Sequence, residues 1–161
     1  SESREKEDKL KEQEKEKRVE RRQLAKERIP IIAKSLSECK EGISTIEDII
    51  IELTESGKAN FCYSTSNDYD DVFHIGLGEV LCKADTRLVY CGLFEEGEKI
   101  RVIVYAGDEI SKEKSAGEIV RSISQILGGA GGGSSKFAQG GGTDKSKKED
   151  AIKNAKTVIL E

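Results

Sequence analysis

The segment from Gly128 to Gly142, GGAGGGSSKFAQGGG, restricts the possible folds of this chain more than any other stretch, because eight of its 15 residues are glycine. Glycine weakens regular helices and strands and adopts positive φ angles that other residues avoid. The segment is therefore predicted to be a flexible loop that other groups can approach closely. The main-chain N–H groups of Gly131–Gly133 are predicted to turn toward one point and form a nest for an anion.

Three side chains interrupt the glycines. Lys136 supplies a cation, Phe137 an apolar plate and Gln139 an amide that both donates and accepts hydrogen bonds. Together with an anion nest, these groups suit a phosphate–sugar–base ligand. The alternative is that Phe137 folds into the core and the glycines serve only tight packing.

Two common nucleotide-binding motifs are excluded. A P-loop needs lysine after its final glycine, where this chain has Ser134, and no window of the segment fits G-x-G-x-x-G. Both motifs also follow a strand, whereas a helix is predicted to precede this segment. An ATP or dinucleotide site is therefore not expected here.

The remainder of residues 58–161 predicts a small α/β domain. A short strand, a polar loop and a helix are expected over 58–63, 64–70 and 71–83, and a hairpin over 88–93 and 100–105 turns at Glu95–Glu98. An amphipathic helix over 111–127 leads into the glycine loop, and Thr143 or Asp144 caps a last helix. The predicted architecture is a small mixed sheet with flanking helices.

Residues 1–57 are predicted to form a long helical, coiled-coil-like subdomain, consisting of an arm and a dimerisation helix. The arm, residues 1–28, carries 11 positive and 9 negative charges, as an exposed helix would. Beyond Pro30, apolar residues recur in alternating steps of four and three up to Leu53, which predicts a heptad helix that ends at Gly57.

The heptad seam needs an apolar partner. The arm is too polar to cover it, so the seam is predicted to form a homodimer interface, with packing on the chain's own domain as the alternative. Ile49 and Ile51 lie off the seam and are expected to face the globular part. The predicted interface residues are Ile32, Leu36, Cys39, Ile43, Ile46, Ile50 and Leu53.

Composition excludes several classes of site. The four cysteines are scattered and His74 is the only histidine, so no zinc site is expected, and free thiols in a reducing cytoplasm are predicted. No apolar run reaches about 18 residues, so no membrane span or membrane partner is expected. Asp68, Asp70 and Asp71 are clustered, but with a single histidine they cannot assemble a two-metal hydrolase site and are predicted to form a solvated loop and a helix N-terminus.

Charge is unevenly distributed over a chain whose net charge is −4. Residues 60–110 carry 4 positive and 10 negative charges, whereas residues 111–161 carry 9 positive and 6 negative charges. An anionic partner is therefore predicted to dock on the last third of the chain. The absence of methionine predicts that the chain is an excised part of a longer protein.

From Ala116 to Gly142 the chain reads AGEIVRSISQILGGAGGGSSKFAQGGG. This stretch resembles the C-terminal, DHH-associated domain of alanyl-tRNA synthetases, particularly of archaeal ones, in which an Ala-Gly-Glu helix precedes GGxGGG and Phe- or Met-Ala-Gln-x-Gly-Gly. It differs at Ser134 and Ser135, where many relatives have Arg-Pro, which leaves Lys136 as the cation. In DHH phosphoesterases a histidine usually follows the glycine triplet, and Ser134 in that place argues against this branch.

The resemblance implies a non-catalytic domain of a cytoplasmic alanine–tRNA ligase. Such a domain binds the outer corner of tRNA(Ala), dimerises the enzyme, and supports aminoacylation and editing of mischarged tRNA. Its partners would be tRNA(Ala), a second copy and the catalytic and editing domains of the same protein, but not DNA. No cofactor is expected in this chain, since the ATP, Mg and Zn sites belong to other domains.

The sequence is also compatible with two other functions. One is a substrate-binding domain of a DHH-family phosphoesterase that acts on nucleotides or short oligonucleotides, and the other is a structural dimeriser without an RNA role. The residues predicted to bind RNA are Gly131, Gly132, Gly133, Ser135, Lys136, Phe137, Gln139, Gly140 and Gly141 of the loop, with Arg121, Lys145, Lys147 and Lys148 near it.

Overall fold

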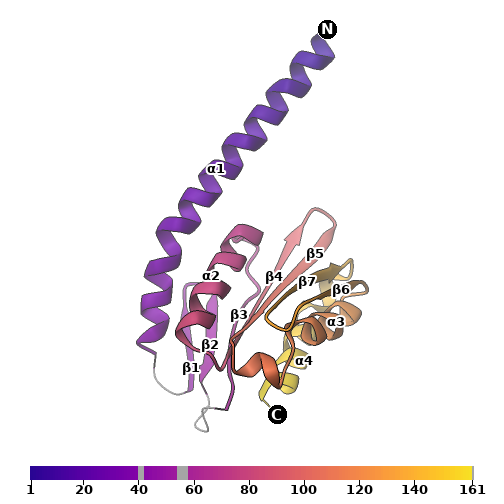
Figure 1. The fold of residues 1–161 in the computed structure, drawn as a ribbon. Helices are drawn as coiled ribbons and strands as arrows, with labels where there is room; N and C mark the ends of the chain where they lie inside the picture. Colours follow the sequence, from indigo (N-terminus) through magenta and orange to yellow (C-terminus); the bar gives the residue numbers. More distant parts are fainter. Residues whose placement is uncertain (40–41, 54–57, 161) are drawn as a thin grey trace.

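The computed structural model describes residues 1–39, 42–53 and 58–160, and within these ranges seven strands form one sheet in the order β1-β2-β3-β4-β5-β7-β6 (Figure 1). The strands are β1 Gly42–Ile46, β2 Ile49–Leu53, β3 Asn60–Ser64, β4 Leu88–Glu96, β5 Lys99–Ala106, β6 Ala130–Gly133 and β7 Phe137–Gly142. The helices are α1 Glu2–Ser37, α2 Asp71–Ala84, α3 Ala116–Ile126 and α4 Lys148–Leu160, with short 3₁₀ turns η1 Ile110–Lys112 and η2 Lys145–Lys147.

One parallel pair interrupts an otherwise antiparallel sheet. β3 and β4 run in parallel and are joined by the crossover helix α2, while every other neighbouring pair is antiparallel. A parallel connection of this kind requires a crossover, which the apolar periodicity of residues 71–84 supplies. The predicted mixed α/β architecture with flanking helices is confirmed.

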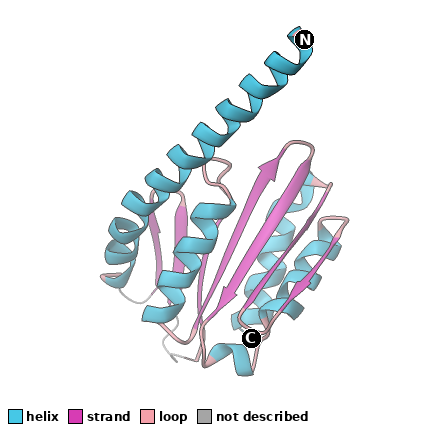
Figure 2. Ribbon diagram, turned by 45° about the horizontal axis from the view of Figure 1, so that its top comes forward, coloured by secondary structure: helices cyan, strands magenta, loops and turns pink. Residues whose placement is uncertain are grey.

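Helices cover both faces of the sheet, and each face has its own core. Val89, Cys91 and Leu93 of β4 point toward α3 and α4, whereas Leu88 and Tyr90 point toward α1 and α2. This alternation follows from the two-residue period of a strand. In Figure 2 the helices lie in front of the β1–β4 end of the sheet and behind its β5–β7–β6 end.

The long N-terminal helix is confirmed, but the heptad helix is wrong. α1 continues through Pro30 to Ser37, and the next described residues form the antiparallel hairpin β1–β2 with a turn in which Glu47 has a φ of 54°. β-branched isoleucines are restricted in helices and favour strands. The prediction for residues 40–41 and 54–57, including the stop at Gly57, lies outside the described residues.

The predicted seam is therefore divided among three elements. Ile49 and Ile51 are buried at 0% and 5% exposure, as expected for residues that face the globular part. Since residues 42–53 form the hairpin β1–β2 of the sheet, they are not part of a helical subdomain. Ile32 and Leu36 are buried on α1, Cys39 is half-buried after it, Ile43 and Ile46 lie on β1, and Ile50 and Leu53 lie on β2.

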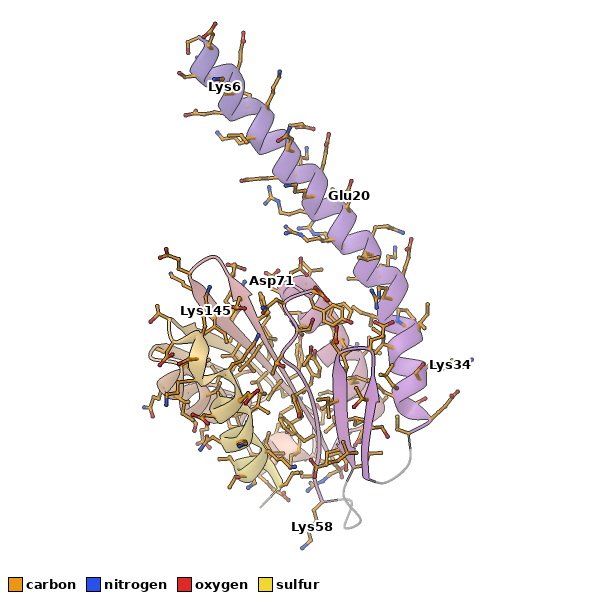
Figure 3. All side chains as sticks on the ribbon, turned by 180° about the vertical axis from the view of Figure 1, so that it is seen from behind. Lys6, Glu20, Lys34, Lys58, Asp71 and Lys145 are labelled. Carbon is orange, nitrogen blue, oxygen red and sulfur yellow. The ribbon has the colours of Figure 1, made fainter. Side chains whose placement is uncertain are left out.

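Residues 1–24 are exposed, and α1 projects beyond the body of the molecule (Figures 1 and 3). Burial of α1 begins at Ala25 and continues through Ile29 and Ile32, which lie against the side of the sheet that carries α2. None of the helices within the described ranges is long and apolar enough to cross a membrane. All four cysteines are free thiols, as predicted.

Candidate nucleic-acid interface

The glycine-rich segment is a β-hairpin, not a flexible loop. β6 and β7 pair in antiparallel register, with Gly131 opposite Gly140 and Gly132 opposite Gln139. The turn is closed by a hydrogen bond in which Ser134 N donates to Phe137 O at 2.8 Å. Because Gly131–Gly133 are extended strand residues, the predicted convergence of their three N–H groups into an anion nest is wrong.

Helix α3 fixes both ends of this hairpin. At the start of the helix, Ala116 N and Gly117 N donate to the carbonyls of Ser135 and Ser134 at 2.8 and 3.0 Å. At its end, Gly128 adopts a φ of 76° and Gly129 N donates back to Ser124 O at 2.8 Å. These bonds satisfy helix-terminal groups that would otherwise lack partners, and they make the hairpin part of the rigid body.

Most glycines of the hairpin are required by packing. A Cβ on Gly131 would lie 2.6 Å from both Gly140 Cα and Val120 Cγ1, and a Cβ on Gly142 would lie 2.0 Å from Leu127 O. Gly140 and Gly141 are equally crowded, at 2.5 and 2.2 Å from their nearest neighbours. The interpretation that the glycines permit tight packing is therefore confirmed for these positions.

The turn of the hairpin exposes Ser135 and Lys136. Lys136 Nζ forms an ion pair with Asp108 Oδ1 at 2.9 Å, and both side chains are more than half exposed. The hydrogen bond from Lys136, together with its charge, lowers the pKa of the Asp108 carboxyl. Phe137 is half-buried against Tyr105 of β5, with ring centroids 4.8 Å apart.

Gln139 is exposed on the same face of β7 as Phe137. Arg101 Nη2 donates to Gln139 Oε1 at 3.0 Å, so the amide group of Gln139 is oriented by an arginine of the neighbouring strand. Arg101 also contacts Glu96 at 3.2 Å and Asp71 at 3.5 Å. The sequence analysis did not include Arg101, Tyr105 or Asp108, although the alternation in IRVIVY, residues 100–105, places Arg101 and Tyr105 on one face of a strand.

The predicted cations do not gather in one patch. Lys145 pairs with Glu95 at 3.4 Å, Lys147 pairs with Asp150 at 3.6 Å, and Lys148 donates to Asn67 Oδ1 at 2.9 Å. Partial burial lowers the pKa of Lys148. Figure 3 shows Lys145 and Asp71 toward one end of the globular body, and Lys58 at its other end.

Lys145 and Lys148 therefore lie near the β4–β5 turn, at the end of β7 opposite the Lys136 turn. Arg121 lies on α3, beside Gly132 of β6. Its Nε lies 3.9 Å from the position of a Cβ on Gly132, and among the described residues Arg121 forms no ion pair.

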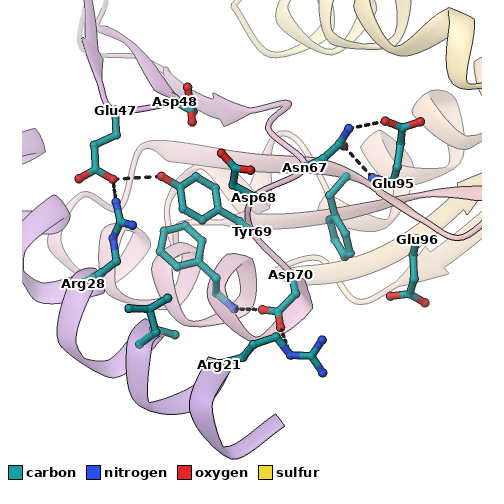
Figure 4. A pocket seen from close by; sticks show the side chains of 14 residues that line it. Arg21, Arg28, Glu47, Asp48, Asn67, Asp68, Tyr69, Asp70, Glu95 and Glu96 are labelled. Atoms are coloured by element: carbon teal, nitrogen blue, oxygen red, sulfur yellow. Dashed lines mark hydrogen bonds and ion pairs between the residues drawn. The ribbon is translucent and has the colours of Figure 1, made fainter. Parts of the chain in front are cut away.

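A separate cleft of about 510 Å³ lies between α1 and the loop after β3 (Figure 4). Arg21 pairs with Asp70 at 3.1 Å, Arg28 pairs with Glu47, and Asn67 bonds to Glu95. Six carboxylates and two arginines line it, so it does not favour a polyanion. The lining residues are Arg21, Leu24, Ala25, Arg28, Glu47, Asp48, Asn67, Asp68, Tyr69, Asp70, Phe73, Phe94, Glu95 and Glu96.

The predicted role of the Asp68–Asp71 cluster as a loop and helix N-terminus is confirmed. Asp70 caps α2 by accepting a hydrogen bond from Phe73 N at 3.1 Å, and Asp71 pairs with Arg101. Within residues 1–39, 42–53 and 58–160, no three His, Cys, Asp or Glu side chains are grouped to hold a metal ion.

A mixed sheet with helices on both faces, and a glycine hairpin bonded to the helix before it, defines a class of small α/β domains. Residues 60–161 match the DHHA1 domain, and the chain belongs to this family.

Several relatives are alanine–tRNA ligases. The chain is 41% identical over 150 residues to that of Nitrosopumilus maritimus, an alignment that covers 93% of this chain and 16% of the ligase. It is 42% identical over 92 residues to that of Cenarchaeum symbiosum, which covers 57% of this chain and 10% of the ligase. The chain thus spans about a sixth of the first relative's length.

Two solved structures have a similar fold. The C-Ala domain of Aquifex aeolicus alanyl-tRNA synthetase superposes with a TM-score of 0.60 at 27% identity, over 65% of this chain and 95% of that domain. A DHH domain described as a member of the s1p family of ribosomal proteins superposes with a TM-score of 0.52 at 16% identity, over 84% of this chain and 31% of that protein. The second similarity, at this low identity, shows the fold alone.

Proposed function

We propose that this chain is the non-catalytic, tRNA-binding part of a cytoplasmic alanine–tRNA ligase. It holds the outer corner of tRNA(Ala) while other domains of the same protein carry out aminoacylation and editing. The observation that carries the proposal is the exposed turn of the glycine hairpin, which presents Lys136 beside Phe137 on a support fixed to α3. Similarity to alanine–tRNA ligases supports tRNA(Ala) as the RNA partner.

Rigidity is what the hairpin contributes to binding. The turn residues are held by main-chain bonds to α3, so little conformational entropy is lost when RNA docks. Lys136 supplies a phosphate contact, and phosphate contacts dominate affinity for nucleic acids. The Lys136–Asp108 ion pair competes with RNA, because the same ammonium group must leave the carboxylate to meet a phosphate.

Two substitutions at this ion pair are expected to change tRNA affinity in opposite directions. Lys136→Ala should weaken tRNA(Ala) binding and reduce the slope of log Kd against log salt by about one unit, since one phosphate contact is lost. Asp108→Asn should tighten binding by up to about fivefold, because the exposed and therefore weak ion pair with Lys136 no longer competes with phosphate. Fluorescence anisotropy of labelled tRNA(Ala) over a series of salt concentrations measures both.

Lys153→Ala is the matched control, since Lys153 is an exposed lysine on α4, outside the hairpin. It should leave the affinity within about twofold and the salt slope nearly unchanged. Equal losses in Lys136→Ala and Lys153→Ala would remove the hairpin turn from the interface. A shift of the same sign in Asp108→Asn and Lys136→Ala would show that the ion pair does not compete with RNA.

A homodimer and contacts with the catalytic and editing domains belong to the same proposal. Ile43 on the edge strand β1 supports a dimer, because it is a large apolar side chain with 67% exposure. Sedimentation velocity over a range of concentrations should show a dimer that Ile43→Asp dissociates. A wild-type chain that stays monomeric at every concentration would contradict this part of the proposal.

A further inference from the structure

Gly132 is a glycine of the hairpin that packing does not require. The nearest atom to a Cβ built on Gly132 is Arg121 Nε at 3.9 Å, an ordinary van der Waals distance. Its φ lies outside the positive range that favours glycine, whereas on either side of it Gly131 and Gly133 are crowded at 2.6 and 2.5 Å. A glycine inside a strand without a packing reason indicates that another group approaches the main chain closely.

The open space above Gly132 lies on a defined face of the sheet. Gly132 is the register partner of Gln139, and residues directly opposite in an antiparallel pair share a face. Gly131 and Ala138 point to the other face, where they meet Val120 and the α3 core. Helix α2 packs on β4 and β5, while β7 and β6 are packed by α3 from behind (Figure 2).

Three kinds of group lie on or beside this face, which α2 covers in part, since Tyr105 packs against Gly78. Phe137 and Tyr105 form a tilted ring pair at 4.8 Å and 37°. Gln139 has its amide oxygen engaged by Arg101 at 3.0 Å, which leaves its N–H donors for another partner. Arg121 lies at the edge beside Gly132 as a cation without an ion pair among the described residues.

We infer that this face, consisting of Tyr105, Phe137, Gln139, Gly132 and Arg121, binds one exposed nucleobase of the RNA together with its phosphate. The base stacks on the ring pair, an acceptor on its edge receives a hydrogen bond from Gln139, and the sugar–phosphate lies over Gly132 against Arg121. Arg101 acts as a positioning residue, because it fixes the orientation of the Gln139 amide. This inference rests on the proposed function and specifies the chemistry of its site.

Two variants test the inference. The chain contains no tryptophan, so Tyr105→Trp introduces a single fluorescent ring at the stacking position. Its emission should be quenched when tRNA(Ala) binds, because a stacked base quenches an indole. Gly132→Val fills the open space and should weaken binding at least about fivefold, the low end of what one base–aromatic stack contributes. Its thermal unfolding midpoint should remain close to that of the wild-type chain, since a Cβ at Gly132 meets no atom closer than 3.9 Å and β-branched side chains are favoured in strands.

Thr45→Val is the control for Gly132→Val, because it likewise places an exposed valine in an edge strand, but at the opposite end of the sheet. It should bind tRNA(Ala) like the wild-type chain. If labelled tRNA binds but the Tyr105→Trp emission is unchanged and Gly132→Val keeps full affinity, the inference is wrong and the proposed function stands. If the wild-type chain does not bind tRNA(Ala) at low salt, the proposed function and the inference fail together. If Gly132→Val does not fold, the fluorescence result decides alone.

Discussion

Replacing Gly131 by alanine is expected to lower the free energy of unfolding by about 3 kcal/mol, the upper range for overpacking a core. The new Cβ would lie 2.6 Å from Gly140 Cα and 2.6 Å from Val120 Cγ1, so the hairpin and α3 must separate. Main-chain atoms of β7 cannot move without breaking its pairing with β5. Urea unfolding followed by circular dichroism measures the loss.

Gly132→Ala is the control, because it changes the next residue of the same strand by the same methyl group. Its unfolding free energy should stay within about 1 kcal/mol of the wild-type value or rise slightly, since alanine loses less backbone entropy than glycine. Equal losses at Gly131 and Gly132 would show that the hairpin does not pack on α3 as described. The difference between the two variants isolates the packing term, because strand position and side chain are matched.

Outside the glycine-rich segment, the sequence pattern predicted the helices and strands of residues 58–161, because their apolar periodicities are clear. The β4–β5 hairpin, α2 and α4 lie close to their predicted ranges, and Asp144 caps the turn before α4 by accepting from Ser146 N. Within α2, Leu77 and Leu81 are buried on the side that faces the sheet, whereas Val80 is 41% exposed.

The N-terminal region shows where periodicity misleads. Apolar spacing of three and four residues continues through Ile43, Ile46, Ile50 and Leu53, yet these residues belong to two strands. The two-residue spacing of Ile49 and Ile51 is the spacing of a strand, and both side chains are buried on one face of β2. Tertiary pairing with β3 supplies the stabilisation that a local pattern cannot reveal.

The sequence predicted which residues of the glycine-rich segment carry functional side chains, but it did not predict their conformation. Lys136, Phe137 and Gln139 are at the hairpin, but glycine composition could not distinguish a strand from a loop, since the pairing involves only main-chain groups. Packing against α3 determines the conformation, and that is a long-range effect. The contacts of Tyr105, Arg101 and Asp108 with the hairpin depend on the pairing of β5 with β7, which the local sequence does not reveal.

His74 is fully buried, and one of its two ring nitrogens lacks a hydrogen-bond partner among the described residues. Its ring fills the space over Gly92, where a Cβ would lie 2.3 Å from His74 Nδ1. His74 Nδ1 is 2.7 Å from Tyr90 Oη, while His74 Nε2 has no hydrogen-bond partner among the described residues. Burial is the main cause that lowers the pKa of His74 from 6.5 to about 3.

The fold should therefore lose stability as pH falls from about 6.5 to about 3. In this window the unfolded chain takes up a proton on His74 that the native chain does not bind. Each decrease in pH therefore favours the unfolded chain and lowers the free energy of unfolding. The full stability is present above pH 6.5, and the loss approaches about 4–5 kcal/mol near pH 3. Urea unfolding at a series of pH values measures this slope.

The double variant His74→Phe with Tyr90→Phe is the control, since it retains two aromatic rings and removes the titrating group with its hydrogen-bond partner. It should unfold with a much shallower pH dependence between pH 6.5 and 3 than the wild-type chain. Because His74 is the only histidine, its Cε1–H resonance in an NMR titration reports the pKa directly. A resonance that titrates near 6.5 in the folded protein would contradict the burial of His74 over Gly92 and the pH dependence derived from it.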